Sequence, residues 1–377
     1  MGAVKKVIVV GGGIGGLTVA HALARQGIET RVIEIGDRSE RLGTGITLLG
    51  NALRALNTLG LVDDCLAGGK GWDKITMRDA TGGLIAEQNS PRVWDPERPG
   101  ALGIMRPVLG QVLEDHARES GATVDFNTHI TAIEQDAEGV TVTLSNGETD
   151  RADLLIAADG VYSKTRSMVF GEQHKPQYVG QGVWRYTIPR HEAFEGFALY
   201  RIPTGPGVGS LLLSDELCYL FFLENSKERP RFSDADGPDH IRRLLAPYTA
   251  EELVEAREEV SADRHISYRP FDVLMMENAW HLGRVVLLGD AAHSLTPQMT
   301  SGGGMAIEDA LVLSEELAVT DDLDTALRAY FERRFPRVRK VFDVGYAICV
   351  EEQDPKHGRE YAMGLLQEGH RFLAGPA

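Results

Sequence analysis

The first part of the chain joins a short apolar segment to a glycine-rich turn, and this pairing constrains the fold more than any other feature. Residues 6–10 (Lys-Val-Ile-Val-Val) are typical of a buried strand, and Gly11-Gly12-Gly13-Ile14-Gly15-Gly16 follows directly. Residues 17–25 have a helical pattern, and Glu34 ends a second apolar strand over residues 30–33. A strand, a Gly-x-Gly-x-x-Gly turn, a helix, a strand and an acidic residue in this order predict a Rossmann-type unit that binds a dinucleotide.

Each glycine of this turn has an expected task. Gly11 permits the tight turn, Gly13 lets backbone N–H groups approach a pyrophosphate, and Gly16 lets the helix pack closely on the strand. The N-terminus of the helix then faces the phosphates with its positive dipole end. Glu34 has the spacing of an acid that accepts hydrogen bonds from ribose hydroxyls.

Composition excludes several other classes of protein. The 377 residues are 43% hydrophobic and 25% charged, which is ordinary for a globular chain of roughly two to three domain-sized units. A net charge of −16 argues against nucleic-acid binding, which needs clustered Lys and Arg. The three cysteines, Cys65, Cys218 and Cys349, are odd in number and far apart, so we expect neither a disulfide framework nor a metal site. We expect no membrane segment, because the N-terminal apolar run is too short. Since the fold is predicted to begin near Lys5, we also expect no targeting peptide and therefore a cytoplasmic protein.

Patterns further along the chain predict an α/β unit, then a sheet, then helices. Predicted helices cover about 51–59, 106–119, 239–259, 302–317 and 323–350. Predicted strands cover 123–126, 130–134, 140–144, 153–158 and 284–288. Residues 177–222 carry aromatic and β-branched runs separated by Gly and Pro, which favours an antiparallel sheet that is distinct from the preceding βαβ pattern.

Three separated segments together resemble one family. The first is the glycine turn with Glu34, the second is Asp153-Leu-Leu-Ile-Ala-Ala-Asp159-Gly160-x-x-Ser163-x-x-Arg166, and the third is Gly289-Asp290-Ala291-Ala292-His293-x-x-x-Pro297. In this order and at these intervals they resemble the single-component FAD-dependent aromatic hydroxylases of the p-hydroxybenzoate and salicylate hydroxylase type, the group A flavoprotein monooxygenases. The resemblance covers nearly the full chain and is weakest over 170–260.

The resemblance implies an α/β fold with a Rossmann-like FAD-binding domain, a β-sheet substrate domain and C-terminal helices. The expected segments are 1–72, 101–172 and 269–320 for the FAD-binding domain, 73–100 and 173–268 for the substrate domain, which is mostly antiparallel sheet, and 321–377 for the C-terminal helices.

The resemblance also implies cofactor contacts. Glu34 would bind the adenosine ribose, Arg106 would reach FAD from its helix, and Asp290 would hold the ribityl–pyrophosphate region. Asp159 would touch FAD and the nicotinamide donor, or would only organise a turn or helix start. The full expected set is Gly11, Gly13, Ile14, Gly15, Gly16, Glu34, Gly45, Arg106, Asp159, Asp290, Pro297, Gly302 and Gly303. After Pro297 the family's Gly-Gln-Gly is replaced by Thr300-Ser301-Gly302, although the loop still supplies N–H groups at a helix start.

The predicted substrate residues are Arg185, Arg201, Tyr219, Phe221 and Pro297, and the predicted catalytic residues are Tyr219, Arg185 and His293. Strand alternation sends Tyr219 and Phe221 to one face of the sheet, where similar pyridine and urate hydroxylases have a substrate-contacting tyrosine. Tyr219 could instead bond backbone within the core. Arg185 and Arg201 could hold a carboxylate or lie on the surface. A structural role for His293 is as favoured as a catalytic one, and Trp184 and Phe222 are expected in the core.

The activity that the resemblance implies has two halves. NADH or NADPH reduces non-covalently bound FAD, and the reduced flavin takes up O₂ as a C4a-hydroperoxide that hydroxylates a small electron-rich aromatic or N-heteroaromatic compound. With one dinucleotide unit visible, we expect the pyridine nucleotide to bind transiently, without a separate reductase. We expect a monomer or homodimer with no nucleic-acid or membrane partner.

Two alternatives remain open at this point. Residues 184–189 (Trp-Arg-Tyr-Thr-Ile-Pro) partly resemble the Trp-x-Trp-x-Ile-Pro of flavin-dependent halogenases. The other alternative is a non-enzymatic flavin-binding redox sensor.

Overall fold

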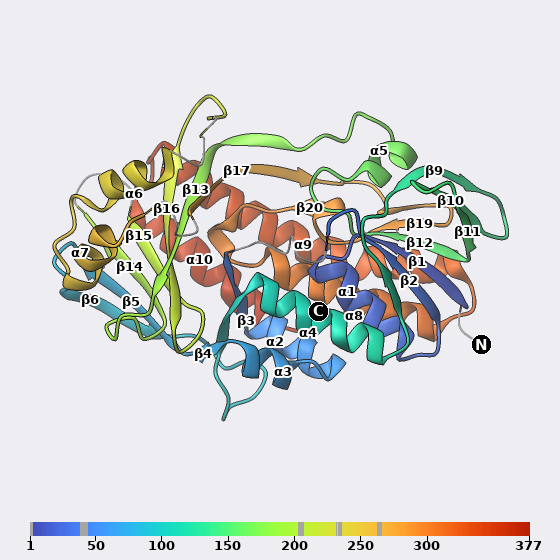
Figure 1. The fold of residues 1–377 in the computed structure, drawn as a ribbon, viewed down its shortest axis with the longest axis horizontal. Coiled ribbons are helices and arrows are strands. Elements are labelled where there is room, and N and C mark those ends of the chain that lie inside the picture. Colours follow the sequence, from blue (N-terminus) through green and yellow to red (C-terminus); the bar gives the residue numbers. More distant parts are fainter. Residues whose placement is uncertain (1–2, 38–43, 203–206, 231, 233–235, 262–265) are drawn as a thin grey trace.

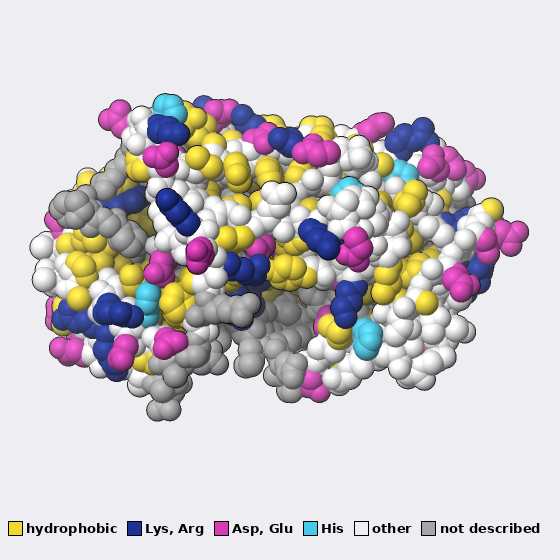
Figure 2. All heavy atoms as spheres, turned by 90° about the horizontal axis from the view of Figure 1, so that it is seen from above, with side chains coloured by type: hydrophobic (Ala, Val, Ile, Leu, Met, Phe, Trp, Pro, Cys, Tyr) yellow, Lys and Arg dark blue, Asp and Glu magenta, His cyan; other side chains and the backbone are white. Residues whose placement is uncertain are grey.

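The computed structural model describes residues 3–37, 44–202, 207–230, 232, 236–261 and 266–377. It has an elongated shape, with a parallel sheet towards one end and a larger sheet towards the other (Figure 1). On the face shown in Figure 2, acidic and basic side chains are interspersed among apolar ones, and neither sign gathers into one large patch. Within the described ranges, no helix is both long and apolar enough to cross a membrane.

The parallel sheet is the Rossmann-type core predicted from the first residues of the chain. Its six strands, in spatial order, are β18 (His281–Leu282), β19 (Val285–Leu287), β12 (Leu154–Ala157), β1 (Lys6–Val10), β2 (Glu29–Ile33) and β8 (Thr123–Asp125). All neighbouring pairs are parallel except β18 with β19. The strand interiors are buried, as the continuous apolar runs predict for strands covered on both faces.

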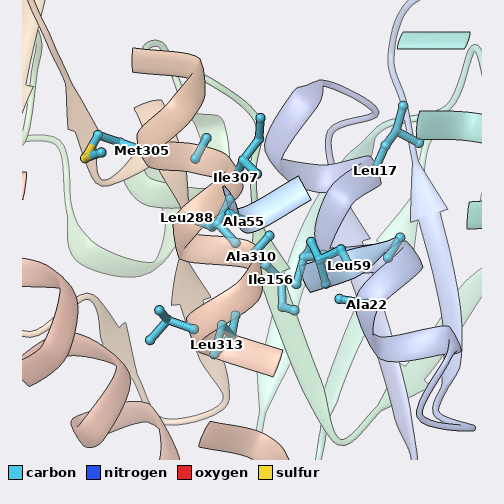
Figure 3. Packing of buried hydrophobic residues seen from close by; sticks show 14 of the residues in the cluster. Leu17, Ala22, Ala55, Leu59, Ile156, Leu288, Met305, Ile307, Ala310 and Leu313 are labelled. Carbon is cyan, nitrogen blue, oxygen red and sulfur yellow. The ribbon is translucent and has the colours of Figure 1, made fainter. Parts of the chain in front are cut away.

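Helices cover the parallel sheet and build the main core. They include α1 (Ile14–Ala24), α2 (Gly50–Leu59), α4 (Arg106–Glu119) and α8 (Gly302–Val319). Helix α1 is buried from Gly15 to Ala24, since it packs against both α4 and α8 and no side of it faces water. Figure 3 shows Leu17 and Ala22 of α1 in one cluster with Ala310 and Leu313 of α8.

Two small sheets and two short helices complete this part of the molecule. One sheet consists of β11 (Thr149–Ala152), β10 (Val140–Leu144) and β9 (Ile130–Gln135), and the other of β3 (Gly45–Leu49), β7 (Ala101–Met105) and β4 (Lys70–Trp72). The short helices are α3 (Val62–Gly68) and α5 (Lys164–Phe170). The strands of the second sheet and both short helices were not predicted.

The larger sheet has eight strands, most of them antiparallel. In spatial order they are β20 (His293–Ser294), β17 (Ile266–Met275), β13 (Gln177–Pro189), β16 (Leu217–Asn225), β15 (Val208–Leu212), β14 (Phe197–Arg201), β5 (Lys74–Asp79) and β6 (Leu84–Asn89). The predicted antiparallel sheet over 177–222 is confirmed. The predicted helical region over 239–259 is two helices, α6 (Gly237–Leu245) and α7 (Glu251–Glu258).

The two faces of strands β13–β16 have different roles. Even-numbered side chains, among them Trp184, Tyr186, Leu220 and Phe222, form a second core with residues of α6 and α7, so the prediction that Trp184 and Phe222 lie in a core is confirmed. Odd-numbered side chains form the opposite surface, which we call the odd face. This assignment follows from the register, which pairs Arg185 with Phe221.

The chain ends in a helical hairpin that packs alongside α8 (Figure 1). Helix α9 (Leu323–Gln353) has 31 residues and extends the predicted helix by one turn, and α10 (Arg359–Leu373), which was not predicted, folds back on it.

Candidate functional site

The glycine turn between β1 and α1 has the geometry that its sequence predicts. Gly11 has φ +106°, and a Cβ there would lie 2.3 Å from the Ala158 carbonyl oxygen. A Cβ at Gly16 would lie 1.9 Å from the carbonyl oxygen of Gly11, whereas Gly13 faces open space. In the described structure no side chain caps the start of α1, so its first N–H groups are available to an anion in front of Gly13.

Glu34 lies directly after β2, at the carboxyl edge of the parallel sheet. Its Oε2 accepts a hydrogen bond from the Gly12 N–H at 2.5 Å, and its Oε1 accepts one from the Gly36 N–H at 2.7 Å. The side chain is half-buried. Glu34 therefore stands beside the glycine turn, where an acid would meet a ribose, and it also helps to close that turn.

A second turn, at residues 289–291, follows strand β19. Gly289 has φ +60°, and its N–H donates to Asp309 Oδ2 at 3.0 Å. Asp290 is exposed, yet the surrounding protein limits its hydration and raises its pKa, while His293 and Arg106 act to lower it. Asp290 therefore presents an accessible carboxylate at the turn after β19, and its contact with a cofactor stays a prediction.

Arg106 begins α4, where the positive end of the helix dipole disfavours a cation. Its guanidinium acts electrostatically on Asp290, Arg185 and Tyr219. It forms no ion pair with any described carboxylate within 4.0 Å. Arg106 thus links the Asp290 turn to the odd face of the large sheet.

Both oxygens of the Asp159 carboxylate accept hydrogen bonds from the protein itself. The carboxylate accepts hydrogen bonds from the Ser163 hydroxyl at 2.5 Å and from the N–H and hydroxyl of Thr165 at 3.0 and 2.9 Å. This geometry favours the alternative in which Asp159 organises the turn before α5, and its contact with a cofactor stays a prediction. Gly160 has φ +81°, which favours glycine.

The loop before α8 presents a second uncapped helix start. Pro297 opens a 3₁₀ turn over residues 297–299, Thr300 takes a left-handed φ of +52°, and α8 begins at Gly302 without a side-chain cap from any described residue. A Cβ at Gly302 would face open space. A Cβ at Gly303 would lie 3.7 Å from Ile14 Cδ1, so the first turns of α8 and α1 meet and the structure brings two uncapped helix starts to one region.

Two of the predicted cofactor glycines mainly allow close packing. A Cβ at Gly303 would lie 2.8 Å from Ile46 Cδ1, and one at Gly45 would lie 1.9 Å from Leu213 Cδ2. Residues 38–43 lie outside the described residues.

His293 is buried, at 1% exposure, and not within reach of a ligand. Its Nε2 lies 2.6 Å from Asp309 Oδ2, and its ring centroid is 5.0 Å from that of Trp280. Its Nδ1 has no hydrogen-bond partner among the described residues. The geometry favours the structural alternative for His293, and a catalytic role stays a prediction.

A buried ionic network lies behind the Asp290 turn and was not predicted. Arg334 Nε donates to Asp309 Oδ1 and Arg334 Nη1 to Glu308 Oε2, both at 2.7 Å. Arg337 donates to both oxygens of Glu308 at 2.8 Å. Burial acts to raise the pKa of Asp309, but His293 and Arg334 lower it, so the carboxylate is held ionised. The sequence signal was Glu308-Asp309 inside the otherwise apolar stretch 305–313.

The odd face carries the predicted substrate residues. Tyr219 is 9% exposed, and its hydroxyl interacts with the Arg185 guanidinium. Burial raises the pKa of Tyr219, and Arg185 acts to lower it. Phe221 lies over Gly209, where a Cβ would be 1.9 Å from the phenyl ring. Tyr219 interacts with Arg185 on the odd face and also packs in an apolar cluster with Trp72 and Leu211, so its contact with a substrate stays a prediction.

Arg201 lies on the odd face at the end of β14, while Arg185 lies at its centre in β13. The Arg185 side chain is half-buried, and burial lowers its pKa. No described carboxylate forms an ion pair with Arg185. The structure thus brings Arg185, Tyr219 and Phe221 together and leaves Arg201 further along the same face.

A surface hollow of about 660 Å³ lies apart from all the predicted site residues. Its lining includes Lys70, Lys74, Arg92 and Arg190. Lys70 is paired with Asp215, Lys74 with Glu195 and Arg92 with Asp73. Since these three cations are already neutralised, the hollow is a poor candidate for an anion site.

Comparison with known proteins agrees with this geometry. The family model described as "FAD binding domain" matches residues 5–344. The putative FAD-dependent monooxygenase YetM of Bacillus subtilis is 31% identical over 372 residues, which cover 97% of this chain and 100% of the relative. An FAD-dependent urate hydroxylase of Klebsiella pneumoniae is 32% identical over 374 residues, covering 95% and 92%. The crystal structure of Klebsiella pneumoniae HpxO with FAD and uric acid has a TM-score of 0.83 and 28% identity, covering 98% and 92%.

Proposed function

We propose that this chain, which belongs to the FAD binding domain family and is an FAD-dependent monooxygenase, hydroxylates a small electron-rich aromatic or N-heteroaromatic compound with NAD(P)H and O₂. Its relatives include enzymes named urate hydroxylase and 3-amino-4-hydroxybenzoate 2-monooxygenase, and their names give no support to the halogenase alternative. The observation that carries the proposal is the pair of neighbouring uncapped helix starts, at Ile14 of α1 and Gly302 of α8, which offer free N–H groups beside Glu34 and the glycine turn.

The cofactor site fits FAD, because acceptors and free donors occur where its parts require them. Glu34 would accept hydrogen bonds from the adenosine ribose, and the N–H groups at the start of α1 would bind the pyrophosphate. Asp290 would accept hydrogen bonds from the ribityl chain, and the start of α8 at Gly302 would face the flavin pyrimidine edge. When bound, FAD supplies the electron transfer and the activation of oxygen.

The remaining contacts orient the substrate. Arg185, with the Tyr219 hydroxyl beside it, would bind an oxygen-bearing or anionic edge of the ring through charge-assisted hydrogen bonds. Phe221 would pack on the ring, and Pro297 would limit its approach to the cofactor. The protein thereby excludes water and fixes which ring carbon faces the flavin.

Further features of the proposal concern organisation. We propose that NADH or NADPH reduces the flavin directly, without a separate reductase, and that the protein acts in the cytoplasm as a monomer or homodimer. We also propose the division into an FAD-binding domain (1–72, 101–172, 269–320), a substrate domain (73–100, 173–268) and C-terminal helices (321–377). Membership of β5, β6 and β13–β16 in one sheet supports that division.

The test combines purified protein with a panel of hydroxylated benzoates, pyridines and purines. We expect released flavin to be FAD, and a panel member to stimulate NAD(P)H oxidation and gain one oxygen by mass. Tyr219→Phe, which keeps the ring, should raise KM or increase uncoupled peroxide at normal FAD content. Flavin released as FMN, or a product that requires chloride, would contradict the proposal. NAD(P)H oxidation that no ring stimulates would instead favour the redox sensor.

A further inference from the structure

The odd face continues beyond Arg185 to a group of amide side chains. Gln181 and Asn225 stand opposite each other in β13 and β16, and alternation places them on the same face as Arg185. Gln181 Nε2 donates to Asn225 Oδ1 at 2.9 Å. This end of the face is polar, in contrast to the Tyr219 end, where Trp72 and Leu211 pack.

The last turn of α9 brings a carboxylate to this polar end. Glu352 Oε2 accepts hydrogen bonds from Gln298 Nε2 at 3.0 Å and from Gln181 Nε2 at 3.4 Å. Gln298 directly follows Pro297 in the loop before α8, and its Nε2 also donates to Gln181 Oε1 at 2.6 Å. Three separate parts therefore meet at Glu352: the sheet, the C-terminal hairpin and the loop that we assign to the flavin.

The hydrogen bonds in this cluster use all the amide N–H donors of Gln181 and Gln298, but they leave some of its oxygen acceptors without a partner in the described structure. A primary amide has two N–H protons. Both protons of Gln298 and both of Gln181 are used. In the described structure Gln298 Oε1 is buried without a partner, and Glu352 is exposed with only one oxygen engaged. The complementary ligand is therefore one that presents N–H or O–H groups.

The surroundings of Glu352 also suit the uptake of a proton. Limited hydration raises the pKa of Glu352, and the two amides and Arg201 act to lower it. The carbonyl end of the α9 dipole further disfavours a negative charge at this position. Arg201 on the odd face and Cys349 one turn back on α9 are the titratable or charged groups that interact with it among the described residues.

We propose that Glu352 contacts the substrate ring, accepts a hydrogen bond from its N–H or O–H group, and removes that proton during hydroxylation. This inference rests on the proposed function. The proton passes from the ring nitrogen or oxygen to Glu352, and the electron pair stays on the ring, where Arg201 and Arg185 face the resulting negative charge. An N-heteroaromatic ring with a donor for the second oxygen of Glu352 is the substrate class that fits.

The test uses the FAD-loaded protein, and ligand binding is followed by the change in flavin absorbance. The probes are uric acid, which carries ring N–H groups, and benzoate, which at neutral pH has neither an N–H nor an O–H donor. The wild type should bind uric acid more tightly than benzoate. Glu352→Gln loses the charge-assisted hydrogen bond, so its Kd for uric acid should rise roughly ten- to a hundredfold, with a parallel rise in KM and unchanged FAD content.

Glu351 provides a matched control on the same helical turn. Its Oε1 accepts hydrogen bonds from the backbone N–H groups of Lys356, His357 and Gly358 at 2.8, 2.7 and 2.8 Å, so it holds the loop before α10. Glu351→Gln should lower the melting temperature and leave the Kd for uric acid unchanged.

The outcomes distinguish a failure of the role of Glu352 from a failure of the proposed function. An unchanged Kd in Glu352→Gln, or a wild type that binds only benzoate, overturns the role of Glu352 and leaves the monooxygenase assignment intact. A wild type for which no ring stimulates NAD(P)H oxidation overturns the proposed function, and the role of Glu352 falls with it.

Discussion

The buried ionic network behind the Asp290 turn should make Arg334 one of the most sensitive positions in the protein. Arg334→Met keeps most of the side-chain volume and removes the charge. Asp309 would keep its hydrogen bonds to Gly289 and His293, and Glu308 would keep Arg337. Both acids are at 0% exposure, so the variant leaves an uncompensated negative charge in the core.

The size of the effect follows from this burial. Removing one partner of a buried ion pair costs about 3–5 kcal/mol. For a chain of 377 residues, with an unfolding entropy of about 2 cal/mol/K per residue, that loss lowers the melting temperature by about 4–7 °C. Because Asp309 Oδ2 also fixes the Gly289 N–H, we expect the variant to release FAD at lower denaturant concentration than the rest of the fold unfolds.

The neighbouring residue supplies the control. Arg333 pairs with Glu315 at 2.9 Å and Glu316 at 2.5 Å, but its side chain is 37% exposed. Arg333→Met should therefore cost only about 0–1 kcal/mol. Both variants would be compared by urea unfolding of the apoprotein and by flavin fluorescence of the holoprotein. Equal losses of stability for the two variants would refute the reasoning, since burial would then not decide the cost.

Three further outcomes are expected. Gly16→Ala would push a methyl group against the Gly11 carbonyl oxygen, so we expect a loss of about 1–3 kcal/mol and weaker FAD retention, measured by unfolding and by dialysis. Asp290→Ala should weaken FAD about ten- to a hundredfold in a fluorescence titration, and an unchanged Kd would remove Asp290 from the site. Burial lowers the pKa of His21, so the unfolded chain binds more protons than the folded chain as this residue titrates. The contribution of neutral His21 to the free energy of unfolding is therefore complete above about pH 6.5 and is lost as the pH falls. His21→Gln should reduce that dependence in urea unfolding at pH 5.5 and 7.5.

Local patterns predicted the cofactor half of the fold well. The glycine turn, strands β1 and β12 and helix α4 could be read from the sequence because each carries a strong local pattern: the glycine motif, a continuous apolar run or helical periodicity. The predicted bounds of 106–119 agree with α4 (Arg106–Glu119). The sheet of β3, β4 and β7 was missed because each strand is short and its partners are distant in sequence.

The site shows the same division between local and tertiary information. Strand alternation sufficed to place Tyr219 and Phe221 on one face. It could not show that the Asp159 carboxylate accepts hydrogen bonds from Ser163 and Thr165, because a cofactor contact and a turn-stabilising role have the same sequence pattern and differ only in three dimensions. Glu352 gave no signal at all, since its role depends on where a 31-residue helix ends relative to the sheet.

Odd and even positions of β13 and β16 serve different neighbours, and this separation has a practical consequence for protein engineering. Even-numbered side chains pack into the second core with α6 and α7, whereas the half-buried Thr187 and Leu223 share the odd face with Arg185. A variant library restricted to these two positions should change which compounds are accepted while expression yield stays near that of the parent. Randomising the intervening even positions should instead produce mostly insoluble variants, because these side chains are buried. The alternation of the two strands thus indicates which positions to diversify and which to keep.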